Sequence, residues 1–412
     1  MESQKKTTFW DKYLLSLSFV AILFSHVAYC ATYYVDNSGL PPCSNNSSYG
    51  TEANPWCTIT YGIAQLSGGD NLYVKAGIYR EDVYIDGPAG NVNKDTLIKA
   101  YPDVTLYGSG VDSGRVTLVN TSHITLDGFA ITNFNQGIFV VSASYITVQN
   151  CLVYNVGQEG IHIKFDSSYV TVQNCTIHDT RAWKYNGEGI YVGTASSQTP
   201  LDNTHHITIR NNTIYNTNDE CIELKPGTHD SIIEGNTMYN CLTDPSITQT
   251  WWGSIEVNQA VNTNQHWNSN PNHIIRNNII HDTKTGLRAG TGALIYNNLI
   301  YKINDPYNGI YVNNNAGDSY VRNIYHNTVD LPSARAVVVE AGTVDIRNNI
   351  GPTGTNNLAT SDDYYVNKVG ANYRLAAGST PNNAGVDLTS IVPTDLEGNL
   401  RILPTDLGAY EK

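Results

Sequence analysis

The sequence predicts an all-β protein whose short strands wind into a parallel β-helix, a solenoid of stacked coils. Three observations predict this fold class. Short β-branched segments recur along the chain, a second set of strands follows most of them at a similar offset, and Asn and Gly are frequent between them. Such a repeat is typical of a solenoid, because each unit buries its apolar side only against its neighbours.

Residues 1–30 are predicted to be a secretion signal and not part of the fold. Lysines precede the apolar run LLSLSFVAILFS, and Ala28-Tyr29-Cys30 resembles a cleavage site with Cys at its last position. Cleavage after Cys30 would give a secreted protein, extracellular or periplasmic. Two alternatives are a lipoprotein anchor on Cys30, which the bulky Tyr29 disfavours, and a retained membrane anchor. No later segment is apolar enough to span a bilayer.

The charge of the chain argues against a nucleic-acid binder, which needs a basic footprint. The formal net charge is −13, from 24 basic and 37 acidic residues. An acidic substrate would therefore need a bound cation or a local basic patch. We expect a monomer that has no membrane contact after signal cleavage.

Residues 31–103 are predicted to form an N-terminal cap and the first coils. Cys43 and Cys57 flank a polar loop and are the best disulfide pair for an oxidising compartment. The segment Thr58 to Asp70 is predicted to be a short amphipathic helix that covers the first coil, because an exposed coil edge invites aggregation. No spacing of Cys and His suggests a zinc site.

The first repeat contains segments such as ITVQNCLVYN and ITIRNNTIYN, which align on one Asn-rich column. The steps are mostly about 20 to 29 residues, with two longer steps of about 37 and 42. We interpret the column as structural, because Asn tolerates the left-handed region at tight turns and stacked amides can hydrogen-bond between coils. Its members are Cys151, Cys175, Asn212, Asn236, Asn278, Asn298, Asn327 and Asn349.

The second repeat contains strands such as GIHIK, GIYVG and CIELK, which alternate apolar with outward-facing residues. Their apolar residues are predicted to stack inside one continuous helix over residues 104–352. The stacked residues are Ile161, Ile190, Ile222, Ile255, Leu287 and Ile310. Residues 353–412 lose the repeat and are predicted to cap the other end.

The whole chain resembles secreted bacterial β-helix proteins of the pectate-lyase superfamily. The segments that carry the resemblance are YYVDNSG, NPWCTITYGIAQL, GDNLYVKAGIYRE and the closing PTDLGAYE. The resemblance implies a right-handed parallel β-helix with a short N-terminal capping helix.

Stacking turns columns of the sequence into surfaces. Three columns follow from the second repeat: the residue before each strand, the outward-facing residue within it and the residue at its end. Together they place many charges on one face. These charges are Glu159, Glu188, Glu220, Glu223, Glu256, Lys164, Lys225 and Arg288. Long insertions at 181–187, 194–205, 242–252 and 259–271 are predicted to wall the same face. Their tryptophans are predicted sugar platforms or simple flank covers. They are Trp183, Trp251, Trp252 and Trp267.

The glutamates that precede successive strands predict a site for a hard cation. Glu188 and Glu220, with Asn186, Asn218 and Glu159, could hold Ca²⁺, which prefers several oxygen ligands. The alternative is a solvated acidic stripe whose charge is relieved by neighbouring lysines.

The segment N-D-E-C-I-E-L-K, Asn218 to Lys225, resembles a motif of polysaccharide lyase family 6, the alginate lyases and chondroitinase B. That family's pattern, E-x-E-x-x-x-x-K, supplies calcium ligands and a catalytic lysine. The resemblance implies that Glu220 is a ligand and Lys225 is the general base, with Asn218 in place of the first acid. Glu188 is placed to be a further ligand.

The sequence departs from the family where a catalytic arginine is expected on the following coil. That strand reads GSIEVNQ and carries Glu256, and the nearest outward arginine is Arg288. Arg288, Tyr191 or His162 could then protonate the leaving oxygen. A lysine whose pKa is lowered near a cation could remove the C5 proton of a uronate.

These observations predict a secreted, calcium-assisted lyase that cleaves an acidic polysaccharide by β-elimination. Lys164, Glu223, Glu256 and the tryptophans would bind substrate. Two alternatives remain open. One is a glycoside hydrolase that uses paired carboxylates about 5 Å apart, and the other is a glycan-binding protein without catalysis. The sequence does not choose among alginate, pectate and glycosaminoglycans.

Overall fold

The computed structural model describes residues 30–86, 95–180, 186–195, 201–258, 271–313 and 318–412. Compactness divides the chain into two units, Met1–Cys30 and Ala31–Lys412. The predicted secretion signal thus lies outside the described residues, apart from Cys30. The second unit contains all the elements that follow.

Three parallel sheets make up the coils of the second unit within the described residues, and we name them A, B and C. Sheet A consists of β1 Thr32–Val35, β2 Asn71–Val74, β5 Thr96–Ala100, β8 Ser122–Asp127, β11 Ser144–Gln149, β14 Ser168–Gln173, β17 Thr208–Arg210, β20 Ile232–Glu234, β23 His273–Arg276, β26 Ala293–Tyr296, β29 Val321–Tyr325 and β32 Thr343–Arg347.

The other two sheets have the same stacking order. Sheet B consists of β3 Gly77–Tyr79, β6 Val104–Tyr107, β9 Ala130–Thr132, β12 Leu152–Val156, β15 Thr176–Thr180, β18 Thr213–Thr217, β21 Thr237–Tyr239, β24 Ile279–Thr283, β27 Leu299–Ile303 and β30 Thr328–Asp330. Sheet C consists of β4 Tyr84–Asp86, β7 Val116–Val119, β10 Ile138–Val141, β13 Ile161–Lys164, β16 Ile190–Val192, β19 Ile222–Leu224, β22 Gly253–Val257, β25 Thr285–Ala289, β28 Ile310–Val312 and β31 Val337–Val339.

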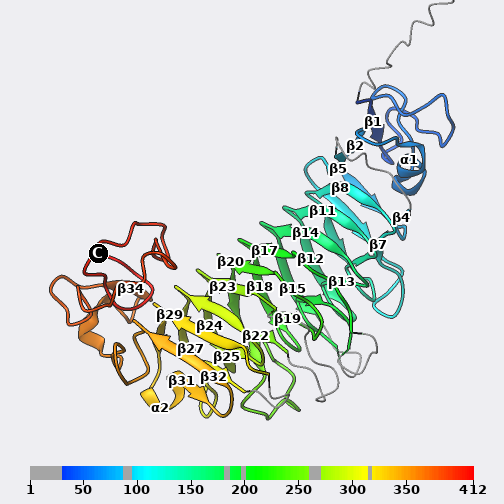
Figure 1. The fold of residues 1–412 in the computed structure, drawn as a ribbon. Helices are drawn as coiled ribbons and strands as arrows, with labels where there is room; N and C mark the ends of the chain where they lie inside the picture. Colours follow the sequence, from blue (N-terminus) through cyan, green and yellow to red (C-terminus); the bar gives the residue numbers. More distant parts are fainter. Residues whose placement is uncertain (1–29, 87–94, 181–185, 196–200, 259–270, 314–317) are drawn as a thin grey trace, which may run out of the picture. The chain divides into compact units, whose positions relative to one another are not determined.

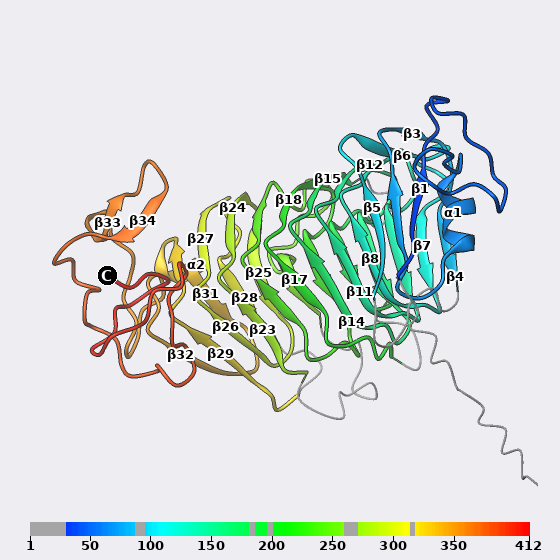
Figure 2. The same cartoon turned by 90° about the horizontal axis from the view of Figure 1, so that it is seen from above.

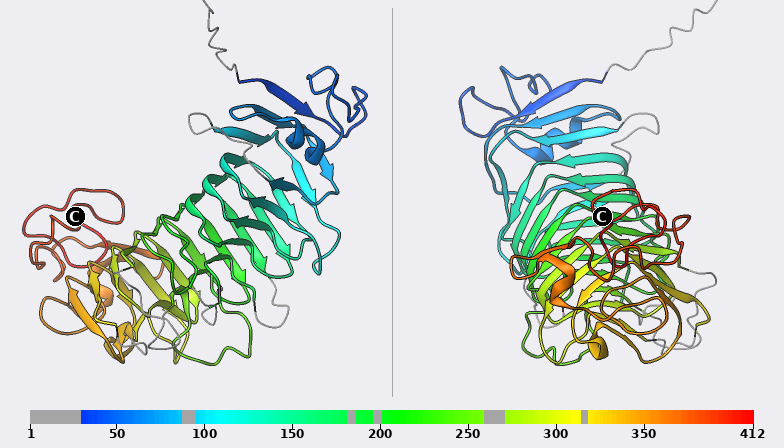
Figure 3. Two further views of the ribbon diagram at one scale, coloured as in Figure 1. Left: turned by 45° about the vertical axis from the view of Figure 1, so that its right-hand side comes forward. Right: turned by 90° about the vertical axis from the view of Figure 1, so that its left-hand side faces the viewer.

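Each coil contributes one strand to each sheet in turn, and every strand pairs in parallel with its equivalents one coil away (Figures 1 and 2). The predicted fold class, a right-handed parallel β-helix, is confirmed. The predicted inner stack is confirmed too, because Ile161, Ile190, Ile222, Ile255 and the two residues that follow them in the register are 0% exposed. Figure 3 shows the coils from two further sides.

The predicted asparagine column forms a ladder of side-chain amides. Asn212 Nδ2 donates to Asn236 Oδ1 at 3.0 Å, and the same 3.0 Å bond recurs from Asn236 to Asn278 and from Asn278 to Asn298. Cys151 and Cys175 continue the column as buried free cysteines, as predicted. The left-handed backbone falls one residue earlier than predicted: Asn150, Asn174 and Asn211 have φ near 55°, and the column residues after them do not. The turn and the ladder are therefore made by neighbouring residues.

Helix α1, Ile59–Gln65, lies within the segment predicted to be helical. Thr58 begins it, since its side chain accepts a hydrogen bond from the Tyr61 N–H. The predicted disulfide between Cys43 and Cys57 is present, with Cα atoms 5.0 Å apart. The helix and the bridged loop lie beside the first strands of sheets A and C (Figure 1).

The C-terminal segment packs against the end of sheet B. It contains a short 3₁₀ helix Asp362–Tyr364 and the antiparallel pair β33 Tyr365–Asn367 and β34 Asn372–Leu375, whereas helix α2 Ser333–Ala336 lies earlier, between β30 and β31. Tyr373 packs on Tyr301 of β27 in a tilted arrangement with ring centroids 4.9 Å apart. No helix in the described part of the chain is long and apolar enough to cross a membrane.

Candidate functional site

The outward-facing positions of sheet C lie in one column across successive coils. The strand register aligns His162 with Tyr191, Tyr191 with Glu223, Glu223 with Glu256, and Glu256 with Arg288. The predicted alignment of these residues is therefore correct. The alternative, a solvated acidic stripe, does not describe these five residues, because they are only 2–6% exposed.

A glycine follows Glu159 and Glu188, two of the carboxylates that precede the strands, and lets each lie close to the next coil. A Cβ on Gly160 would lie 2.7 Å from the Gly189 carbonyl oxygen, and a Cβ on Gly189 would lie 2.6 Å from the Cys221 carbonyl oxygen. Only glycine permits the coils to approach this closely. Glu188, directly before Gly189, is thereby fixed one coil from Glu220.

Three carboxylates from two adjacent coils converge, and we call them the acidic cluster: Glu188, Glu220 and Glu223. Each offers an oxygen, and these oxygens lie within 4.8 Å of one another. All three side chains are buried. Glu223 Oε2 has no hydrogen-bond partner among the described residues. Sequence reasoning assigned Glu223 to substrate, whereas its position makes it part of the cluster.

Burial and mutual repulsion raise the pKa values of this region. Burial first, then Glu223, raises the pKa of both Glu188 and Glu220 well above the usual range. Burial raises the pKa of Glu256, although its ion pair with Arg288 acts in the opposite direction. Burial raises the pKa of Asp219 to about 7. The cluster thus binds protons, or another positive charge, more readily than an exposed set of carboxylates.

Lys225 ends the strand that carries Glu223 and forms an ion pair with it. Its side chain is 16% exposed, and its Nζ lies 4.9 Å from the centre of the Tyr191 ring. Burial lowers the pKa of Lys225, but Glu223 and the carboxylates beyond it outweigh burial and raise the pKa well above its usual value. The predicted lowering of this pKa depends on a cation in the acidic cluster and stays a prediction, since the carboxylates alone act in the opposite direction.

Arg288 lies one coil beyond Glu256 and is paired with it. Its Nε also donates to Asn313 Oδ1 at 3.2 Å. Asn258, two residues after Glu256, donates to Glu223 Oε1 at 3.0 Å. Arg288 is ion-paired with Glu256, and the coil of Glu256 lies between Arg288 and Lys225. Both facts weaken its predicted role as the proton donor.

His162 and Tyr191 lie side by side with ring centroids 4.5 Å apart. His162 Nε2 donates to the Gly193 carbonyl oxygen at 3.0 Å, so Nδ1 is the bare nitrogen, and it has no hydrogen-bond partner among the described residues. Burial lowers the pKa of His162 to about 3, which keeps the ring neutral. Burial also raises the pKa of Tyr191, which keeps its hydroxyl protonated. The one proton of the neutral His162 ring is thus used in the bond to Gly193, whereas Tyr191 keeps a hydroxyl proton that it could give.

Three predicted calcium ligands lie apart from the acidic cluster or beside it. Glu159 accepts a hydrogen bond from Gln136 at 2.7 Å, and the Asn218 amide donates to Asp244 Oδ2 at 3.5 Å. Asn186 is half-buried two residues before Glu188. The structure therefore favours a smaller ligand set than the sequence did.

The predicted tryptophan wall is described in part. Trp251 is 42% exposed, as a platform for a sugar would be, whereas Trp252 packs against the apolar core. Trp183 and Trp267 lie outside the described residues. For Trp252 the alternative, a cover for the flank of the helix, is the better description.

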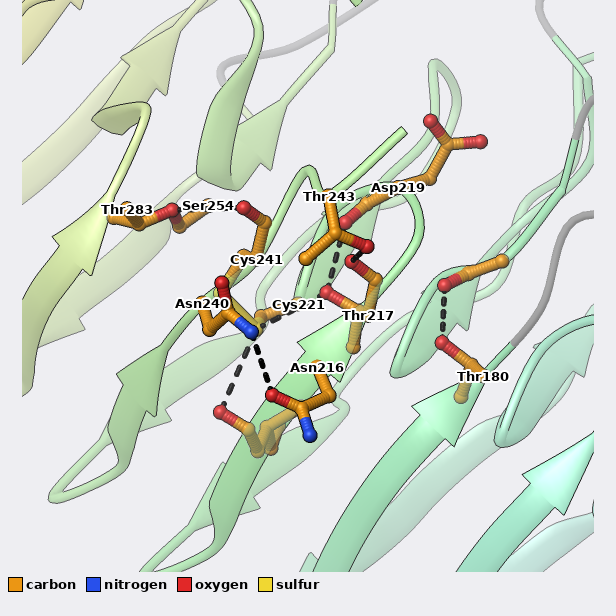
Figure 4. Close-up of a disulfide and its surroundings, with 12 residues drawn as sticks. Thr180, Asn216, Thr217, Asp219, Cys221, Asn240, Cys241, Thr243, Ser254 and Thr283 are labelled. Atoms are coloured by element: carbon orange, nitrogen blue, oxygen red, sulfur yellow. Dashed lines mark hydrogen bonds between the residues drawn. A yellow bond between two sulfur atoms is a disulfide. The ribbon is translucent and has the colours of Figure 1, made fainter. Parts of the chain in front are cut away.

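A second disulfide, which sequence reasoning missed, joins Cys221 to Cys241 with Cα atoms 5.5 Å apart (Figure 4). Cys221 follows Glu220 directly and occupies the position that glycine holds in the coils before it. Thr217 donates to the Asp219 carbonyl oxygen at 2.8 Å and contacts the Cys221 sulfur at 3.4 Å. The disulfide and the contacts of Thr217 therefore fix the backbone on both sides of Glu220. In the sequence, this disulfide was indicated by a cysteine at the position where the preceding coils have glycine.

Comparisons with known proteins agree with this architecture. The family model described as "Right handed beta helix region" matches residues 105–204 and 200–351. No curated protein sequence matches the chain.

Solved structures that resemble the chain include both lyases and hydrolases. An alginate lyase from Paenibacillus sp. strain FPU-7 is 17% identical with a TM-score of 0.54, over 73% of this chain and 96% of that protein. The pectate lyase Pel9A is 16% identical with a TM-score of 0.58, over 93% and 96%. A glycoside hydrolase is 11% identical with a TM-score of 0.60, over 80% and 96%. At these identities the likeness concerns the fold.

Proposed function

The chain belongs to the right-handed β-helix family, and from this premise we propose that it is a secreted lyase that cleaves a uronate-containing polysaccharide by β-elimination. One observation supports this most: Lys225 lies at the edge of the acidic cluster, and the cluster oxygens lie within 4.8 Å of one another. The motif that resembles the family 6 lyases contains Lys225 and two members of the cluster, Glu220 and Glu223. The disulfides are compatible with secretion.

The acidic cluster fits a hard divalent cation such as Ca²⁺. Glu188, Glu220 and Glu223 would hold it, since carboxylate oxygens are its preferred ligands. The unpartnered, buried Glu223 Oε2 supports this assignment, because a buried polar atom without a partner is costly. Bound there, calcium would offset the carboxylate charge of a uronate and so make its C5 proton more acidic.

Lys225 would accept that proton at Nζ. It can do so only when unprotonated, and the charged carboxylates around it now oppose this. A cation that neutralises Glu188, Glu220 and Glu223 would remove the repulsion between these carboxylates. It would also remove the main cause of the raised pKa of Lys225. The base and the acidic cluster are therefore coupled in function.

Tyr191 is the best placed donor for the leaving oxygen. Loss of the C5 proton forms the double bond between C4 and C5 and breaks the bond from C4 to O4, and O4 then takes the phenolic proton of Tyr191. Tyr191 lies in the strand before that of Lys225, and Lys225 Nζ lies 4.9 Å from its ring centre. Trp251 and Glu256 would contact the sugar units on either side.

A glycoside hydrolase is the second candidate. The raised pKa values of Glu188 and Glu220 are those a general acid needs, and the carboxylates are close enough for a retaining pair, which requires about 5 Å. The fold likeness to a glycoside hydrolase is compatible with it. The two candidates differ in product, because only a lyase creates a double bond.

A screen of alginate, pectate and glycosaminoglycans tests the proposal. We expect a product that absorbs in the ultraviolet from one of these polymers, and we expect chelation to abolish it. New reducing ends without ultraviolet absorbance would establish the hydrolase instead. Binding without any product would leave neither reaction standing.

A further inference from the structure

Sheet C carries a second group of charges on the N-terminal side of the acidic cluster. Arg115 directly precedes β7, Phe139 lies in β10, and Lys164 ends β13; these three strands are neighbours in the sheet. The Arg115 guanidinium carbon lies 4.6 Å from the Phe139 ring centre, and Lys164 Nζ lies 4.8 Å from it. Two cations thus share one aromatic ring.

These two cations have no ion-pair partner among the described residues, in contrast with Lys225 and Arg288 on the same sheet. Arg115 donates to the neutral Gln136 Oε1 at 2.5 Å. Like charges side by side are unfavourable unless an anion lies between them. The carboxylates of Glu159 and Asp202 attract Lys164 without forming an ion pair with it, so the two cations can still accept an anion from outside the chain.

Phe165 adds an exposed ring to this group. Its φ is 54°, a left-handed conformation that a bulky residue adopts only when its surroundings impose it. The buried Asp202 imposes it, since its carboxylate accepts the backbone N–H groups of Phe165 at 2.8 Å and Asp166 at 3.1 Å. The ring is 47% exposed and lies 4.6 Å from Lys164 Nζ.

The surface between Lys164 and Lys225 carries no side chain at the intervening position. Gly193 lies between them in the column, and a Cβ there would lie 2.9 Å from the Lys225 Cβ. Beside it, His162 Nδ1 is a buried acceptor without a partner among the described residues.

We propose that Arg115, Phe139, Lys164 and Phe165 form a subsite for a carboxylate-bearing sugar unit, of which Lys164 lies two coils N-terminal to Lys225. The inference rests on the proposed function for the substrate class and adds where a neighbouring uronate binds. Two coils correspond to about 10 Å, so the glycan chain crosses the coils along sheet C and passes over Gly193 on the coil between. The cations bind the carboxylate, and the Phe165 ring packs on the sugar face.

The test compares the wild type with the double variant Arg115→Gln, Lys164→Gln by calorimetric titration in chelator. The probes are oligouronates of two and six units, dextran sulfate and a neutral glucan. We expect the variant to lose about tenfold or more in affinity for the six-unit oligouronate, with little change for the two-unit one. Lys302→Gln, which removes one positive charge from sheet B at a 58% exposed side chain, should leave both affinities unchanged.

The outcomes separate this proposal from the lyase proposal. Unchanged affinity of the double variant for the six-unit oligouronate would overturn the subsite, even if the wild type produces ultraviolet-absorbing product. An equal loss for dextran sulfate would overturn it as well, because a general charge effect would then explain the result. A specific loss for the oligouronate would support the subsite even if no polymer is cleaved.

Discussion

Lys225 is the residue on which the proposed chemistry depends. Lys225→Arg keeps the positive charge and the pair with Glu223, but arginine remains protonated and cannot act as a base. We expect kcat to fall by roughly 10² to 10⁴ with the melting temperature nearly unchanged. Initial rates of ultraviolet absorbance measure this. Lys302→Arg on β27 is the control, and a fall of equal size there, or none in Lys225→Arg, would remove Lys225 from the mechanism.

Tyr191 makes a second prediction at the residue scale. Tyr191→Phe keeps the ring against His162 and Lys225 but removes the hydroxyl that is proposed to protonate the leaving oxygen. We expect kcat to fall by about 10² or more while KM changes little. Tyr311→Phe, four coils along the same column and hydrogen-bonded to Glu340, should retain activity. If Tyr191→Phe retains its kcat, another group must protonate the leaving oxygen.

At the scale of elements, the asparagine ladder joins the coils at the corner between sheets A and B. Asn278 Oδ1 accepts from the Asn236 backbone and side chain, each at 3.0 Å, and its Nδ2 donates to Asn298. Asn278→Ala would leave these buried groups unpaired, so we expect a loss of about 2 to 5 kcal/mol in the free energy of unfolding. Denaturant titration measures it. Asn203 is exposed, so Asn203→Ala should change the free energy of unfolding by no more than about 0.5 kcal/mol. A similarly small loss in Asn278→Ala would show that the ladder does not stabilise the fold.

The disulfide beside the acidic cluster gives a prediction for both stability and binding. The bond spans a sequence separation of 20, and a loop of this size is worth about 3 kcal/mol. Cys221→Ser with Cys241→Ser should lower the melting temperature and weaken calcium binding, since Cys221 follows Glu220. Cys43→Ser with Cys57→Ser should lower the melting temperature alone. If both double variants bind calcium like the wild type, the second bond does not position the cluster.

At the scale of the whole molecule, the buried carboxylates make stability depend on pH and calcium together. The folded-state pKa values of Glu188, Glu220 and Glu256 are raised, and that of Asp219 is raised to about 7. A raised group contributes stability that is complete below its unfolded pKa and is lost as pH rises through the folded one. In chelator we therefore expect the melting temperature to fall as pH rises from about 4 towards 7 and above.

Calcium should reverse this fall, because a ligand that binds only the folded chain stabilises it by about 2.7 kcal/mol at a hundred times its Kd. Thermal unfolding across pH, with and without calcium, measures both effects. Glu188→Gln with Glu220→Gln should flatten the pH dependence and remove the calcium effect, whereas Glu52→Gln, a surface carboxylate paired with Lys75, should change neither. A wild type indifferent to calcium at neutral pH would contradict the metal assignment.

The sequence predicted the stacking and the columns, because period-two alternation and the Asn repeat depend on local spacing alone. It placed Glu188, Glu220, Glu223 and Lys225 on one face for the same reason. It did not predict the burial of Glu223 or the raised pKa of Lys225. Both arise from side chains of several coils closing on one another, and spacing along one strand does not contain that information.

The bond from Cys221 to Cys241 also determines how the chain responds to proteolysis. It encloses the segment that contains β19, Lys225, the turn at Gly227 and β21. A protease that cuts inside this segment would leave two fragments that remain covalently joined. Such a nicked protein would migrate as an intact chain on a gel without reductant and would separate into two bands once the bond is reduced.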